Sequence, residues 1–192
     1  MRPTTTARRV LRTAAACAVA LPAAASAQQR SPTPLDPVHV TARATRADQL
    51  DARAAAYEQA DDSRRWGKAA RLRERAAALR PAADPGGFTS LRAAAFSRHA
   101  LGQRVAAGYL MERAGDQAMA RGDVFNAADA YVDAAYIAAE LRDPERVREF
   151  VGKGTLLMGS PLLSPPQRES LRGRVAQAAP RPGLEVAAAP HP

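Results

Sequence analysis

Histidine side chains are candidate metal ligands and catalytic groups, and a site built from them needs an ordered part of the fold. The chain has three, His39, His99 and His191, and the first and last lie in proline-rich segments without helical periodicity. No two histidines stand four residues apart, and neither an HExxH nor a CxxCH motif occurs. We therefore expect no metal site and no cofactor.

Candidate nucleophiles and phosphate-binding residues also lack the surrounding motifs that such sites need. The stretch 152–155, Gly-Lys-Gly-Thr, lacks the earlier glycine and the preceding strand of a phosphate-binding loop. No serine stands in a GxSxG motif. The single cysteine, Cys17, excludes a disulfide framework and a cysteine-based zinc site. The sequence thus predicts a protein that is not an enzyme.

Basic residues are concentrated in one part of the chain. Residues 64–104 hold ten basic and two acidic side chains, whereas residues 105–145 hold three basic and eight acidic ones. This charge either forms a cationic surface for an anionic polymer or lipid headgroups, or complements the acidic helices inside the stack. Trp66 is the one aromatic residue within 64–80, so nucleic acid is not expected. The candidate basic patch comprises Arg64, Arg65, Lys68, Arg71, Arg73 and Arg75.

The N-terminal residues 1–27 have the pattern of a secretory signal peptide. Four arginines precede an uncharged stretch, and Ala25-Ser26-Ala27 predicts cleavage before Gln28. Lipid attachment at Cys17 is the alternative, although no Leu-like residue stands three positions before it. We expect an exported protein, periplasmic or secreted. No later run is apolar enough to predict a transmembrane segment in the mature chain.

The rest of the chain divides by composition into a helical centre and two flanks. We expect a disordered linker at 28–43, a helical domain at 44–178 and a disordered Pro/Ala-rich tail at 179–192. Alanine alone is more frequent than Leu, Ile, Val and Phe together. This balance favours closely packed helices over a β-sandwich.

Capping and breaking residues predict six or seven helices. The stretch 88–121 is either one long helix or two that meet near Gly102, and we favour two. The region 124–141 carries two apolar stripes, so its helix should lie between neighbours on both sides. The boundary signals are Thr45 with Asp48, Ser63, Leu79-Arg80-Pro81, Asp84-Pro85-Gly86-Gly87, Gly122-Asp123, Asp143-Pro144 and Ser164 with Gln167.

Residues 108–141 resemble one complete tetratricopeptide repeat. The resemblance rests on small residues in the first helix, a Gly-Asp turn and a small–aromatic–small pattern in the second helix. A weaker likeness covers about 50–81, where Tyr57 replaces a small residue and the turn glycine is missing. The two stretches begin further apart than one repeat length, so an irregular insertion separates them. The matching residues are Ala114, Gly115, Gly122, Asp123, Ala127, Tyr131 and Ala134, and then Trp66, Ala69, Ala76 and Pro81. Ala118 stands where the family usually has an aromatic residue.

The resemblance implies an all-α protein. Its antiparallel helical hairpins would stack as a short, irregular tetratricopeptide-like α-solenoid flanked by disordered termini. Proteins of this family bind proteins or peptides in a groove, and the family implies no catalysis. In this register Tyr109, Glu112, Asp116 and Met119 line the groove, and their spacing of 3, 4 and 3 independently places them on one helix face.

The expected function is therefore a non-catalytic protein- or peptide-binding scaffold or adaptor of the bacterial periplasm or cell envelope. The alternative is an envelope polyanion-binding protein that uses the Arg-rich helix 64–80. The sequence leaves the identity of the partner and the oligomeric state open.

Overall fold

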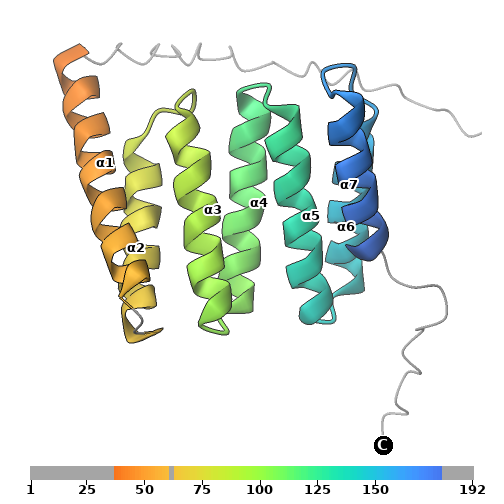
Figure 1. The fold of residues 1–192 in the computed structure, drawn as a ribbon, viewed down its shortest axis with the longest axis horizontal. Coiled ribbons are helices and arrows are strands. Elements are labelled where there is room, and N and C mark those ends of the chain that lie inside the picture. The colour runs from red at the N-terminus through yellow and green to blue at the C-terminus, as the bar shows by residue number, and fades with distance from the viewer. Residues whose placement is uncertain (1–36, 61–62, 179–192) are drawn as a thin grey trace, which may run out of the picture. The chain divides into compact units, whose positions relative to one another are not determined.

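The computed structural model describes residues 37–60 and 63–178, and the regular structure within them is entirely helical (Figure 1). This confirms the all-α prediction. The division of 88–121 into two helices is confirmed as well. The seven helices of the described residues are α1 (Pro37–Gln59), α2 (Ser63–Leu79), α3 (Pro85–Ala100), α4 (Arg104–Ala120), α5 (Val124–Glu140), α6 (Pro144–Met158) and α7 (Pro165–Ala178).

Each helix packs mainly against the helices before and after it in the chain. Consecutive helices run antiparallel because short turns join them (Figure 1). The odd-numbered helices form one layer and the even-numbered helices the other, and α7 closes one end by packing on both α5 and α6. The predicted stack of helical hairpins, an α-solenoid, is therefore confirmed. None of the described helices is long and apolar enough to cross a membrane.

Three evenly spaced turns share one geometry. Their central residues Gly102, Gly122 and Arg142 have φ angles of 74°, 73° and 56°. In each turn the next residue donates its N–H to a carbonyl five positions back, at 2.9–3.0 Å. This is the Schellman end of an α-helix, which uses a left-handed residue to satisfy the last carbonyls. The chain therefore reverses direction abruptly at each of these turns.

Aspartates start three of the helices. Asp84, Asp123 and Asp143 each accept a hydrogen bond from a backbone N–H in the first turn of α3, α5 and α6. Ser164 and Gln167 form the predicted capping box at α7, with the Gln167 side chain accepting from the Ser164 N–H at 2.9 Å. The end of α2 at Leu79, before Pro81, is also as predicted.

Two expected boundaries are wrong. Thr45 does not start a helix, because it lies inside α1 and its hydroxyl donates to the carbonyl of Thr41 at 3.0 Å. α1 begins at Pro37, so residues 37–43 are helical rather than linker. The break at 84–87 is also shorter than expected, since Gly86 and Gly87 lie in the first turn of α3. Residues 28–36, the signal region 1–27 and the tail 179–192 lie outside the described residues.

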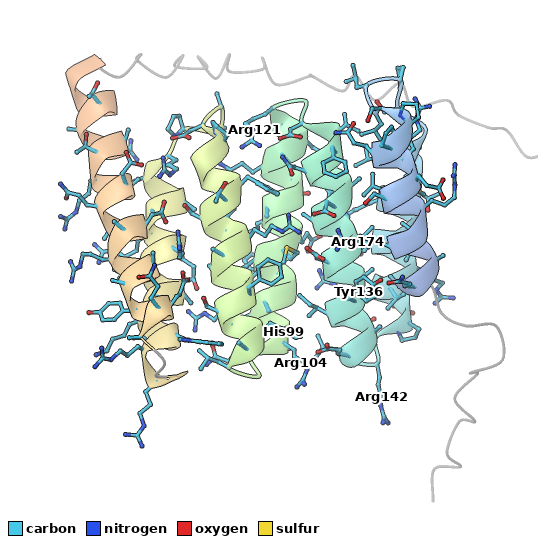
Figure 2. The ribbon with its side chains drawn as sticks, in the orientation of Figure 1. His99, Arg104, Arg121, Tyr136, Arg142 and Arg174 are labelled. Atoms are coloured by element: carbon cyan, nitrogen blue, oxygen red, sulfur yellow. The ribbon has the colours of Figure 1, made fainter. Side chains whose placement is uncertain are left out.

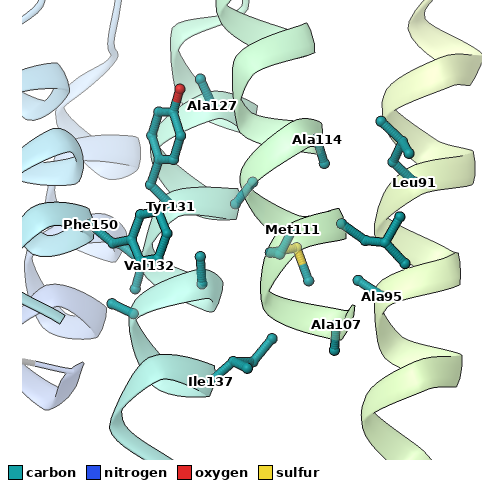
Figure 3. Close-up of a cluster of buried hydrophobic side chains, with 14 of the residues drawn as sticks. Leu91, Ala95, Ala107, Met111, Ala114, Ala127, Tyr131, Val132, Ile137 and Phe150 are labelled. Atoms are coloured by element: carbon teal, nitrogen blue, oxygen red, sulfur yellow. The ribbon is translucent and has the colours of Figure 1, made fainter. Parts of the chain in front are cut away.

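The main core is built largely of alanine (Figure 3). It extends from Ala77 of α2 to Ala178 of α7. α5 lies at its centre and packs on α4, α6 and α7, as its two apolar stripes predict. Larger side chains such as Met111 and Phe150 fill the spaces between alanines. Because the alanine side chain is a single methyl group, neighbouring helices approach closely and the two layers pack tightly.

Candidate functional site

The four predicted groove residues do lie along one side of α4. Tyr109 and Met119 are 57% and 38% exposed. Val105, one turn before Tyr109, is 72% exposed, although the repeat pattern did not single it out. We call this surface the α4 ridge, and it comprises Val105, Tyr109, Glu112, Asp116 and Met119. It is a mixed surface of exposed apolar groups and carboxylates.

The two acidic residues of the α4 ridge already have partners within the protein. Glu112 accepts from Arg146 Nη2 at 2.5 Å and from Lys153 Nζ at 3.3 Å, which ties α4 to α6. Asp116 accepts from the hydroxyl of Tyr131 on α5 at 2.7 Å. Burial and the Asp116 carboxylate both raise the pKa of Tyr131 above its usual value, so it stays a donor at neutral pH. Glu112 and Asp116 therefore stabilise the surface, while Tyr109 and Met119 remain accessible.

Two hollows border α4. The turn-side hollow, beside the turn that precedes α4, has a volume of 620 Å³ and is lined in part by Val105, Tyr109 and Leu141. The α2–α4 hollow has a volume of 450 Å³ and lies where α2 ends beside α4. Its lining includes Ala78 on α2 and Asp116 on α4. The α4 ridge thus contributes residues to both hollows.

The candidate basic patch divides into an inner and an outer part. Arg73 points inward, where it bonds Glu58 at 2.8 Å and Asp51 at 3.3 Å. Burial lowers the pKa of Arg73, but these two carboxylates outweigh burial and raise the pKa above its usual value. Arg64 and Arg65 are exposed, and both take part in interactions. The outer part that remains consists of Lys68, Arg71 and Arg75, which we call the α2 cationic stripe.

The α2 cationic stripe has no acidic partner in the part of the chain that the structure describes. Its residues follow each other at steps of 3 and 4, and all are exposed. Glu74, the acidic residue of α2, is engaged by Arg98 of α3 at 2.8 Å. This stripe is therefore an exposed positive charge on the even-numbered layer.

Several other arginines join neighbouring helices. Arg80 contacts Asp48, Asp51 and Asp84 at 2.7–3.0 Å. Arg92 of α3 contacts Asp129 and Asp133 of α5, and Arg174 of α7 contacts the same two aspartates. These pairs agree with the interpretation that basic and acidic helices complement each other within the stack. Figure 2 shows Arg174 directed toward α5.

His99 takes part in a structural contact at the end of α5. Its Nε2 lies 2.8 Å from Glu140 Oε2, and Arg104 Nε donates to the same oxygen at 2.6 Å (Figure 2). The hydrogen bonds from Arg104 and His99 lower the pKa of Glu140. No group of three or more His, Cys, Asp or Glu side chains that would suit a metal ion occurs among residues 37–60 and 63–178.

A third hollow, of 410 Å³, lies among α1, α2 and α3 and was not foreseen. It is lined by Trp66 and by Phe96, which is 51% exposed, with Glu58 and Ser97 also in the lining. Trp66 therefore faces this hollow rather than joining the α2 cationic stripe. The only sequence signal for it was the apolar character of these two aromatic residues.

Comparison of the chain with protein-family models, with curated proteins and with solved structures finds no match.

Proposed function

We propose that the protein is a non-catalytic scaffold or adaptor that binds a protein or peptide on its even-numbered helix layer. The α4 ridge carries this proposal, because it places exposed apolar side chains beside two hollows. Val105 and Tyr109 are more than half exposed, and both line the turn-side hollow. Exposed apolar groups rimmed by polar ones are typical of protein-interaction surfaces.

We propose that this array works as a tetratricopeptide-like helical repeat does, with a rigid surface formed by alternate helices. The period here is longer than in that family. Both the step from Pro85 to Val124 and the step from Arg104 to Pro144 exceed the length of a tetratricopeptide repeat. The longer helices lengthen the surface along the helix axes.

We further propose an exported protein of the bacterial periplasm or cell envelope. The support is the signal-like pattern of residues 1–27, which precedes the described helices. An envelope location would bring the helix layer into contact with envelope proteins. The partner is then expected among exported or membrane-associated proteins.

Affinity capture from envelope extracts tests the binding surface. The bait is the purified protein, and the test variant is Val105→Asp combined with Tyr109→Ala. Both residues are exposed, and an acidic residue is compatible with the first turn of α4, so the fold should be retained. The matched control is Leu162→Asp, because Leu162 is 73% exposed in the turn before α7.

The proposal predicts a protein retained by the wild type and by Leu162→Asp but lost from the double variant. Circular dichroism of each bait verifies that the helices remain. Equal retention by all three baits would contradict the proposed surface, as would the absence of any retained protein.

A further inference from the structure

The α2–α4 hollow and the α2 cationic stripe form one continuous surface. Ala78 lines the hollow, and Arg75 and Arg71 stand three and seven positions before it. With the period of an α-helix these three positions share one face of α2. All three are exposed. Arg71 and Arg75 therefore lie on the face of α2 that ends at the hollow.

The opposite wall of this hollow adds a further cation. Arg113 of α4 lines the hollow, and its guanidinium lies 5.7 Å from the ring centre of Tyr109. It makes no ion pair with any residue that the structure describes. Asp116, the carboxylate in this lining, accepts a hydrogen bond from the hydroxyl of Tyr131, which holds it toward α5 but leaves its negative charge in place. The lining therefore holds an unpaired cation on the α4 side, Arg113, whereas Arg80 on the α2 side is paired with three aspartates. The cations of α2 without an acidic partner among the described residues, Arg71 and Arg75, lie beside the hollow.

The floor of the hollow is apolar and shallow. Its buried side chains are Ala77 of α2 and Leu91 of α3, and the exposed Ala120 of α4 adds another small side chain to the lining. Small alanine side chains leave space for another chain to approach closely. A polyphosphate has no apolar group to cover this floor, a polyglutamate carries a carboxylate at every position, and a flat membrane surface cannot enter a hollow. A segment that alternates carboxylates with small apolar residues fits both the walls and the floor.

From this we infer that the α2–α4 hollow binds an acidic peptide segment with small apolar residues, whose carboxylates pair with Arg71, Arg75 and Arg113. The inference rests on the proposed function, because it names the class of partner for the same helix layer. Charge complementarity supplies the selectivity, since exposed cations without partners favour an anionic segment and disfavour a basic one.

Fluorescence anisotropy with defined peptides tests the inference. The probe is a labelled peptide of five Glu-Ala-Ala repeats, and its neutral counterpart has five Gln-Ala-Ala repeats. Polyglutamate of the same length, inorganic polyphosphate and phosphatidylglycerol vesicles represent anions without the apolar pattern. The test variant is Arg71→Glu combined with Arg75→Glu. The control variant is Arg148→Glu, an exposed residue of α6.

We expect the Glu-Ala-Ala peptide to bind about tenfold more tightly than the Gln-Ala-Ala peptide and than polyglutamate. The double variant should weaken this binding by about tenfold, and Arg148→Glu should change it by less than about twofold. Raising the salt concentration from about 50 mM to about 300 mM should weaken it as well, because the contacts are exposed.

Three results would overturn the inference. The first is equal affinity for the acidic and the neutral peptide. The second is equally tight binding of polyglutamate, polyphosphate or the vesicles, which would indicate a general anion surface. The third is equal loss in the double variant and in Arg148→Glu. Each of these leaves the proposed function intact if capture still depends on Val105 and Tyr109, so the two failures are distinguishable.

Discussion

Gly115 of α4 lets the ring of Tyr131 on α5 pack directly against the backbone of α4. A Cβ atom at this position would lie 2.6 Å from Cε1 of Tyr131. The ring cannot move freely, because its hydroxyl is bonded to Asp116 and the residue is only 5% exposed. A side chain as small as a methyl group therefore does not fit here without a shift of the ring.

We predict that Gly115→Ala lowers the free energy of unfolding by about 1–3 kcal/mol, since the ring must shift and its hydrogen bond must weaken. Chemical denaturation followed by circular dichroism measures the change. The matched control is Gly152→Ala in α6, where a Cβ meets nothing within 4 Å. The control should stabilise the protein by up to about 1 kcal/mol. Destabilisation of equal size in both variants would contradict the packing account.

Asp84 links helix capping to the charge network. Burial raises its pKa, but the bonds from the Gly86 N–H and the Arg80 guanidinium outweigh this, so the pKa lies below its ordinary value of 3.8. A carboxylate with a lowered pKa contributes stability that is present above its ordinary pKa and is lost as the pH falls through the folded-state pKa. Asp84 is therefore expected to make the protein sensitive to acid.

We predict that Asp84→Asn reduces the loss of stability between about pH 5 and pH 3, because Asn still caps α3 but does not titrate. Urea denaturation at both pH values measures this. A loss of stability in acid that is as large in Asp84→Asn as in the wild type would contradict the role of the charge.

Helical spacing alone predicts only part of the α4 ridge. The spacing of Tyr109, Glu112, Asp116 and Met119 was sufficient to place them on one face of a helix. It did not show that the two acids are occupied, because their partners Tyr131 and Arg146 lie 15 and 34 residues further along the chain. Contacts of this range depend on how the helices pack, and helical periodicity does not determine that packing.

Turns between helices were the most predictable elements. Gly122-Asp123 and Asp143-Pro144 were located correctly because each combines a helix end with a cap. The even spacing of the turns at 102, 122 and 142 does not stand out in the sequence, since the third turn has arginine instead of glycine. Thr45 resembles a helix cap in the sequence but lies inside α1, because the hydroxyl of a threonine within a helix can also bond a carbonyl of its own helix.

Arg142 occupies a left-handed position that glycine fills in the two equivalent turns. We predict that Arg142→Gly stabilises the protein by roughly 0.5–1 kcal/mol, because the left-handed strain of a side chain exceeds the entropy cost of glycine. Thermal denaturation measures the change. The reciprocal variant Gly122→Ala should lower the stability by a similar amount. A lower melting temperature for Arg142→Gly would refute this account of the turn.

The whole array should unfold as one cooperative unit. The alanine-rich core is continuous from α2 to α7, and the pairs Arg92–Asp129 and Arg174–Asp133 join three odd-numbered helices. In stacked helical arrays, stability spreads through such nearest-neighbour interfaces. A destabilising substitution in a central helix should therefore also lower the stability of the terminal helices.

We predict that Ala127→Leu lowers the stability by about 1–3 kcal/mol, because Ala127 is fully buried in α5 and the added carbons overpack the core. The transition should shift equally by circular dichroism and by the fluorescence of Trp66, which lies in α2. An unchanged melting temperature would contradict the tight packing, and a shift in only one signal would contradict the cooperativity.

The central claim is that a partner binds the even-numbered layer along the α4 ridge. Photo-cross-linking in cells that make the protein tests it most directly, with benzoylphenylalanine placed at Tyr109 or, as the control, at Phe96. Both positions are about equally exposed, at 57% and 51%, but Phe96 lies on α3 in the other layer. The account predicts a cross-linked protein from position 109 and none from position 96. Adducts from position 96 alone, or none from position 109, would contradict it.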